Sequence, residues 1–149
     1  MHTFSTIKPK MNNAAYEEFI SSTDTLRVYA DNILVFSSSQ ERLLALLEYI
    51  EVSASNYPDV VILDKVLGNA AAFLAIKACC REVYSPLGSK LAIKTLDKHA
   101  IKHYIEQVVP YIHQDHQEEI CPMERLSIGK KPAEFYALMK SLAKRNPEG

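Results

Sequence analysis

This sequence has almost no net charge, no long apolar run and few glycines. The formal net charge is −1, so the chain has no electrostatic footprint for nucleic acid or for an anionic membrane. No apolar run approaches the roughly 20 residues that a membrane-spanning helix needs. Residues 1–11 also lack the apolar segment of a secretory signal. We therefore expect neither a nucleic-acid partner nor a membrane partner.

Cysteine is scarce as well, and Cys79, Cys80 and Cys121 cannot all pair within one chain. A bridge between the adjacent Cys79 and Cys80 would be strained. A reducing cytoplasm is therefore the expected location. Because the chain has only four glycines, each of them is expected to serve the backbone.

The length and composition indicate one globular domain. A chain of 149 residues with 48% apolar residues can bury one core. We expect a disordered leader over residues 1–11, a single domain over 12–145 and a tail over 146–149. The high apolar content for this size also predicts self-association, on a surface that the sequence does not identify.

Hydrophobic patterning predicts alternating helices and strands. A serine cap ahead of Glu41 indicates the start of an amphipathic helix, and Asp31-Asn32 between two apolar runs indicates a hairpin turn. The expected elements in chain order are a helix over 12–20, strands over 26–29 and 33–36, a helix over 41–52, a strand over 59–63, a helix over 69–80, a strand over 82–85, a turn over 86–89, a helix over 89–99, a strand over 101–109, a short ordered segment over 121–127 and a helix over 132–142. This order predicts an α/β fold in which one five-stranded mixed sheet carries helices on both faces.

Polar residues follow the predicted strands where the chain turns into a helix. In an open α/β sheet, ligands bind beyond the carboxyl ends of the parallel strands. Free backbone N–H groups at helix starts favour anions, and Lys65 can add a positive charge. We therefore predict that three such breaks converge on a site for a small anionic or nucleotide-like ligand. The predicted ligand-binding residues are Ser39, Glu41, Asp64, Lys65, Gly68, Asn69, Ser85, Gly88 and Ser89.

The same residues also allow a purely structural interpretation. Asp64, Asn69 and Ser89 are suited to closing helix ends, and the glycines are suited to turns. Asp64 can also serve as a general base if the fold removes it from water. The sequence leaves these alternatives open.

Cys121 has two interpretations as well. It can be a nucleophile or redox thiol, with Glu124 nearby and His113 or His116 as the base. It can instead be a small buried apolar residue in a Cys-Pro turn. The spacing of His113, His116 and Cys121 is loosely metal-like, but the polar neighbours indicate a solvated loop, so no metal site is expected.

Three segments, Asp64–Ala72, Tyr84–Ser89 and Cys121–Ser127, resemble the motifs of an uncharacterised prokaryotic family. That family is a domain of unknown function placed in the cytidine deaminase-like fold. The resemblance covers roughly residues 12–142. It implies a three-layer α/β/α domain and carries no established activity.

Active deaminases of that fold hold zinc with a His-x-Glu or Cys-x-Glu motif at one helix start and a Pro-Cys-x-x-Cys motif at the next. By element order, the resemblance aligns these motifs with Ser39–Glu41 and Asp64–Gly68. A rival alignment places them at Gly68–Ala70 and Pro86–Lys90. Because none of these segments contains a His or Cys ligand, zinc-dependent deamination is not expected.

Two functions follow from the sequence. The first is a non-catalytic small-ligand-binding or regulatory domain with no cofactor and no zinc. The alternative is a metal-independent enzyme that uses Asp64, Lys65 or Cys121 on a small nucleotide-like or carbonyl substrate. We favour the first, because no complete set of acid, base and nucleophile can be assembled from the sequence.

Overall fold

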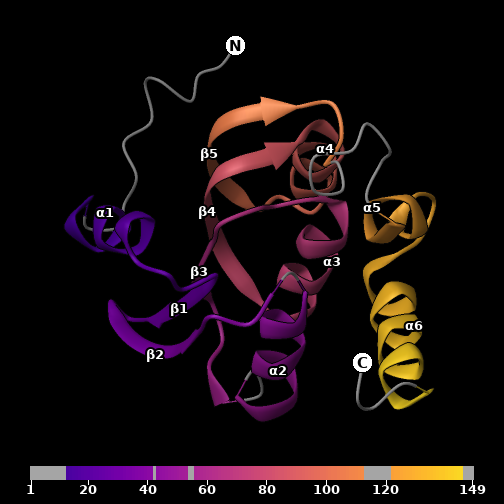
Figure 1. The fold of residues 1–149 in the computed structure, drawn as a ribbon, viewed down its shortest axis with the longest axis horizontal. Helices are drawn as coiled ribbons and strands as arrows, with labels where there is room; N and C mark the ends of the chain where they lie inside the picture. The colour runs from indigo at the N-terminus through magenta and orange to yellow at the C-terminus, as the bar shows by residue number, and fades with distance from the viewer. Residues whose placement is uncertain (1–12, 42, 54–55, 113–121, 146–149) are drawn as a thin grey trace.

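The computed structural model describes residues 13–41, 43–53, 56–112 and 122–145 of the chain (Figure 1). In this part of the chain, helices and strands alternate after an opening helix and hairpin. The elements are α1 (Asn13–Ser21), β1 (Leu26–Ala30), β2 (Ile33–Ser38), α2 (Leu44–Val52), β3 (Val60–Asp64), α3 (Asn69–Lys77), β4 (Cys80–Ser89), α4 (Lys90–Lys98), β5 (Lys102–Val109), α5 (Pro122–Ser127) and α6 (Pro132–Arg145). None of these helices has both the length and the apolar character needed to cross a bilayer.

The strands form one five-stranded mixed sheet in the order β2-β1-β3-β4-β5. β3, β4 and β5 are parallel to one another, whereas β1 is antiparallel to both of its neighbours. All five residues of β3 are buried, because this strand lies in the centre of the sheet and is covered on both faces. The predicted α/β class and the predicted five-stranded mixed sheet are therefore confirmed.

Helices cover the two faces of the sheet unequally (Figure 1). On one face, Phe19 of α1 packs with Leu63 and Tyr84. The other face carries the larger core, to which α2, α3, α4 and α6 contribute. α3 lies in the middle of that core, and its residues from Asn69 to Ala75 are all buried. Its run of alanines lets the helix approach its neighbours closely, and α5 and α6 lie against its outer side.

Two boundaries predicted from the sequence are wrong around β4. The strand begins at Cys80 and continues to Ser89, so α3 ends earlier than expected and residues 86–89 form no turn. The cause is long-range pairing. Leu67, beyond the end of β3, donates its N–H to the Leu87 carbonyl at 2.8 Å and accepts the Ser89 N–H at 3.0 Å. A strand that is held by a distant segment leaves no local signal in its own sequence.

The predicted serine cap of α2 is also wrong. The helix begins at Leu44, and Leu43 at its start forms no side-chain capping bond. Ser38 instead belongs to β2, and its hydroxyl accepts the N–H of Gln40 at 3.1 Å. The Thr25 hydroxyl donates to the carbonyl groups of Ser38 and Gln40. These bonds keep the connection extended, so α2 begins later in the chain than the sequence predicts.

Left-handed backbone occurs at several residues other than glycine. Asp31 and Asn32 have φ values of 51° and 68°, as expected for the tight hairpin turn that the sequence predicted. Cys79 and Ala100 have φ values of 63° and 58° just after α3 and α4. Helices commonly end with glycine at this position, because a Cβ atom is unfavourable there.

We expect Ala100→Gly to raise the free energy of unfolding by roughly 0.5–1 kcal/mol, because the left-handed backbone costs an alanine about that much more than a glycine. Ala100 is exposed, so the substitution removes little packing. Urea unfolding measures the difference. The control Lys98→Gly, at an exposed position in the last turn of α4, should lower stability by about 1 kcal/mol. An Ala100→Gly variant no more stable than the wild type would contradict the expectation.

Candidate functional site

The predicted ligand-binding residues follow β2, follow β3 or lie near the end of β4, and these three segments meet at one end of the sheet's strands. Strand pairing aligns Leu26 with both Ser38 and Asp64, so β2 and β3 end at the same level. Beyond Asp64 the chain runs beside the end of β4, where Leu67 and Gly88 form a bridge. The fold thus brings together the segments that carry the predicted ligand-binding residues.

Thr25 joins the segments that follow β2 and β3, although no sequence pattern distinguishes this residue. Its N–H donates to the Ser38 carbonyl at 2.8 Å, and its hydroxyl donates to the Gln40 carbonyl. Its own carbonyl accepts the N–H of Lys65 at 3.1 Å. A threonine between a helix and a strand is common, so only the folded structure distinguishes this one.

Asp64 is the last residue of β3, and its side chain is buried, with 7% of its surface exposed. One carboxyl oxygen accepts the N–H of Val66 at 3.3 Å. The described residues supply no other hydrogen bond to this carboxyl. Burial raises its pKa to about 7, although the Val66 N–H lowers it in part. Asp64 is therefore a carboxyl group that changes its charge near neutral pH.

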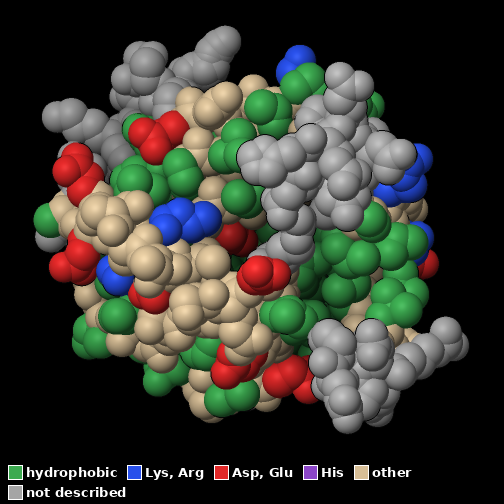
Figure 2. Space-filling view, viewed as in Figure 1, with side chains coloured by type: hydrophobic (Ala, Val, Ile, Leu, Met, Phe, Trp, Pro, Cys, Tyr) green, Lys and Arg blue, Asp and Glu red, His purple; other side chains and the backbone are tan. Residues whose placement is uncertain are grey.

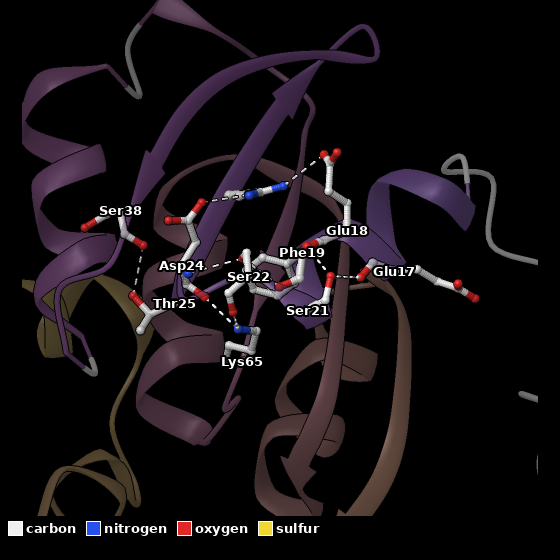
Figure 3. Close-up of polar contacts among 10 residues, drawn as sticks. Glu17, Glu18, Phe19, Ser21, Ser22, Asp24, Thr25, Ser38 and Lys65 are labelled. Carbon is white, nitrogen blue, oxygen red and sulfur yellow. Dashed lines mark hydrogen bonds and ion pairs between the residues drawn. The ribbon is translucent and has the colours of Figure 1, made fainter.

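Lys65 points toward the connection between α1 and β1 (Figure 3). Its ammonium donates to the carbonyls of Ser22 and Asp24, each at 2.8 Å. It also lies 4.8 Å from the centre of the Phe19 ring. These contacts link the centre of the sheet to α1. The predicted role of Lys65 as the positive charge of a ligand site stays a prediction.

Glu124 of α5 occupies the start of α3. Its side chain has 2% of its surface exposed. One carboxylate oxygen accepts the Asn69 N–H at 2.5 Å, and the other accepts the Ile112 N–H at 2.8 Å. A carboxylate is favourable here, because it meets the positive end of the helix dipole and satisfies backbone donors.

Gly68 gives Glu124 the space to reach the helix start. A Cβ atom at residue 68 would lie 2.8 Å from the nearer carboxylate oxygen and 3.1 Å from a side-chain carbon of Ile112. The glycine therefore serves a close approach between two parts of the chain. This fits the expectation that each of the few glycines has a backbone role.

Asn69 extends the same network through its side chain. Its amide nitrogen donates to the Ser127 hydroxyl at 3.0 Å, and its amide oxygen accepts the Thr95 hydroxyl. The Ser127 hydroxyl in turn donates to the Glu124 carbonyl at 2.6 Å. This buried network joins α3, α4 and α5, so the first and third of the family-like segments meet inside the protein.

Ser85, Gly88 and Ser89 have structural contacts of their own. The Ser89 hydroxyl accepts the Ala92 N–H at 3.1 Å and so caps α4, as the structural interpretation required. The Ser85 hydroxyl donates to the Leu87 carbonyl at 2.8 Å. A Cβ atom on Gly88 would lie 3.0 Å from two side-chain carbons of Ile105. Packing and capping therefore account for these three residues.

The remaining candidates are exposed or lie outside the described residues. Ser39 and Glu41 are exposed in the connection between β2 and α2. Cys121, His113 and His116 lie outside the part of the chain that the structure describes, so the two interpretations of Cys121 and the expectation of no metal site there stay predictions. Within the described ranges, no group of three His, Cys, Asp or Glu side chains could hold a metal ion.

Figure 2 shows one face of the molecule hollowed near its centre, with acidic side-chain atoms at the bottom of the hollow.

Replacing Glu124 should test the network at the start of α3. Glu124→Gln should lower the free energy of unfolding by about 2 kcal/mol, because one buried backbone N–H would face an amide NH₂ group and lose its charged acceptor. Chemical unfolding measures the loss. Glu134→Gln is the matched control, because the Glu134 carboxylate accepts the Lys131 N–H at 2.9 Å on the surface; we expect a loss below about 0.5 kcal/mol there. Equal losses in the two variants would argue against a special role for Glu124.

Asp64 should make stability depend on pH. Its pKa is about 7 in the folded protein and near its ordinary value of 3.8 in the unfolded chain. The stability linked to the protonated form is therefore complete below about pH 4 and is lost as pH rises to about 7, at up to roughly 1.4 kcal/mol per pH unit.

Asp64→Asn removes this titration, so the variant should gain stability relative to the wild type between pH 5 and pH 7. Urea unfolding at several pH values measures the gain. Asp59→Asn, an exposed position just before β3, should give a nearly constant difference. The same constancy for Asp64→Asn would refute the raised pKa.

Comparisons with known proteins agree on one relationship. Residues 15–142 match a protein family described as a domain of unknown function, DUF1893 (TM1506). The fold is similar to the crystal structure of a DUF1893 family protein, TM1506, from Thermotoga maritima, with a TM-score of 0.78, 19% sequence identity and 95% of each chain covered. No curated protein matches the chain. Because the matched family spans most of the sequence, this protein belongs to the DUF1893 family.

Proposed function

We propose that this protein is a non-catalytic small-ligand-binding domain whose ligand contacts Asp64 at the carboxyl end of β3. One observation carries the proposal. The Asp64 side chain is more than nine-tenths buried, yet its only hydrogen bond from the described residues is the one at 3.3 Å from Val66. Buried polar groups normally have good partners. The second Asp64 oxygen has none from the described residues and keeps only slight contact with solvent. A bound molecule with hydrogen-bond donors would supply the missing partner.

The position of Asp64 supports the same proposal. It lies at the carboxyl end of β3, and ligands of open α/β sheets bind beyond the carboxyl ends of the parallel strands. Val66, two residues further on, has 45% of its surface exposed. An exposed apolar side chain beside a polar group is typical of small-molecule sites.

Binding without catalysis fits the roles of the neighbouring groups. The Lys65 ammonium binds two backbone carbonyls, and the Glu124 carboxylate binds two backbone N–H groups. Neither is free to exchange protons with a substrate in this arrangement. These contacts therefore favour a binding domain over an enzyme.

One observation favours a second candidate function. A carboxyl group with a pKa of about 7 is suited to act as a general base at neutral pH. In this alternative, Asp64 removes a proton from a small nucleotide-like or carbonyl substrate without a metal. Turnover of a bound compound, abolished by Asp64→Asn, would select the enzyme.

The cytidine deaminase-like assignment is part of the proposal. An opening hairpin followed by parallel strands, in the order β2-β1-β3-β4-β5, supports it. Under this assignment the two zinc motifs of active deaminases correspond to the connections before α2 and α3. Those connections are linked here through Thr25 and carry no His or Cys. The fold would then serve ligand binding without zinc chemistry.

A thermal-shift panel tests the proposed site. Nucleosides, nucleotides, sugar phosphates, small amines, small guanidines and small acids are each added to wild type, Asp64→Asn and Asp59→Asn. We expect at least one compound at 100 times its Kd to raise the wild-type Tm by roughly 5–10 °C. The shift should disappear in Asp64→Asn and persist in Asp59→Asn. If no compound shifts the Tm, or if the shift survives in Asp64→Asn, the proposed site is wrong.

A further inference from the structure

We infer that the ligand of the Asp64 site is a small planar cation with paired N–H donors, a guanidinium or amidinium group. This inference rests on the proposed function and narrows the ligand to one chemical class. It departs from the anionic ligand that the sequence predicted. The reason lies in how the protein uses its own charged groups around the ends of β2, β3 and β4.

The place that an anion would take is filled by the protein itself. The Glu124 carboxylate accepts the N–H of Asn69 at 2.5 Å at the start of α3. Gly68 leaves no further room, since even a Cβ atom there would come within 2.8 Å of that carboxylate. A second anion at this helix start would meet a buried negative charge at contact distance, where repulsion is strong.

The nearby cations also have partners within the protein. The Lys65 ammonium is bound to the Ser22 and Asp24 carbonyls (Figure 3). Arg27, on β1, donates to the Asp24 carboxylate at 2.8 Å and to the Glu18 carboxylate at 3.3 Å. Neither side chain is directed at Asp64 by these contacts. An incoming phosphate or carboxylate would therefore lose its hydration without gaining either cation as a partner.

What the strand ends offer a ligand is an acceptor. Asp64 has a carboxyl oxygen that receives no hydrogen bond from the described residues, and it is buried enough for a bound charge to be weakly screened. The exposed Glu41 follows β2 at the same edge of the sheet. A carboxylate pairs best with a planar group that presents two parallel N–H donors.

The apolar surroundings favour a planar cation over a compact ammonium. Val66 is 45% exposed next to Asp64. The flat face of a guanidinium is weakly hydrated and tolerates apolar contact, whereas an ammonium holds its water strongly. The same chemistry can come from a free small molecule or from an arginine side chain of a peptide, and the experiment separates these sources.

Titration calorimetry on the full chain tests the inference with defined probes. The probes are methylguanidine, benzamidine, N-acetyl-arginine amide, methylamine, inorganic phosphate, cytidine and cytidine monophosphate. We expect at least one of the first three to bind at least tenfold more tightly than methylamine and phosphate. Asp64→Asn should weaken that binding at least tenfold, and Asp59→Asn should leave it unchanged. If N-acetyl-arginine amide binds more tightly than the two small cations, the source of the planar cation is an arginine side chain. If the small cations bind more tightly, the source is a free small molecule.

The outcomes separate this inference from the proposed function. If phosphate or a nucleotide binds more tightly than the planar cations and depends on Asp64, the inference is overturned while the proposed site stands. If neutral cytidine binds more tightly than the planar cations and its binding depends on Asp64, the inference is likewise overturned and the proposed site stands. Should no probe and no compound of the thermal-shift panel depend on Asp64, both proposals fail. The ranking of the probe affinities is measured on the wild type alone. The inference can therefore still be overturned if Asp64→Asn folds poorly.

Discussion

The buried carboxylate of Glu124 is the interaction on which much of this structure depends. It joins the start of α3 to a residue 55 positions away in the sequence and also holds the backbone at Ile112 beyond β5. Charge-assisted bonds of this kind contribute about 1.5–3 kcal/mol each, and removing the acceptor leaves buried N–H donors without a partner. With α5 fixed in this way, α6 lies against the outer side of α3, where Phe135 meets Phe73 at 5.8 Å between ring centres.

A second set of contacts fixes the other side of β3. Thr25 and Lys65 tie the α1–β1 connection to the ends of β2 and β3. The connection from β3 to α3 is therefore held at both of its ends, by Lys65 near the strand and by Glu124 at the helix. Asp64 lies at the start of this fixed connection. A carboxyl that the fold largely removes from water keeps a raised pKa and remains available to a ligand.

Three residues of the predicted ligand site have structural contacts of their own in the fold. The sequence pattern predicts Gly68, Asn69 and Ser89 as anion-binding residues at helix starts. In the structure Ser89 caps its own helix, whereas Gly68 and Asn69 accommodate Glu124. A helix start does attract a carboxylate, because its free N–H groups carry a partial positive charge. The sequence could not reveal that the carboxylate comes from the same chain, since that depends on how α5 packs.

The sequence by itself determined the α/β class, the five-stranded mixed sheet and the grouping of polar connections at one sheet edge. Apolar periodicity and turn residues act over short distances, so they can be read directly from neighbouring residues. Only the tertiary structure decided the full length of β4, the late start of α2 and the separate roles of Asp64, Lys65 and Glu124. Those features depend on hydrogen bonds between segments far apart in the chain and on which carboxyl groups the packing removes from water.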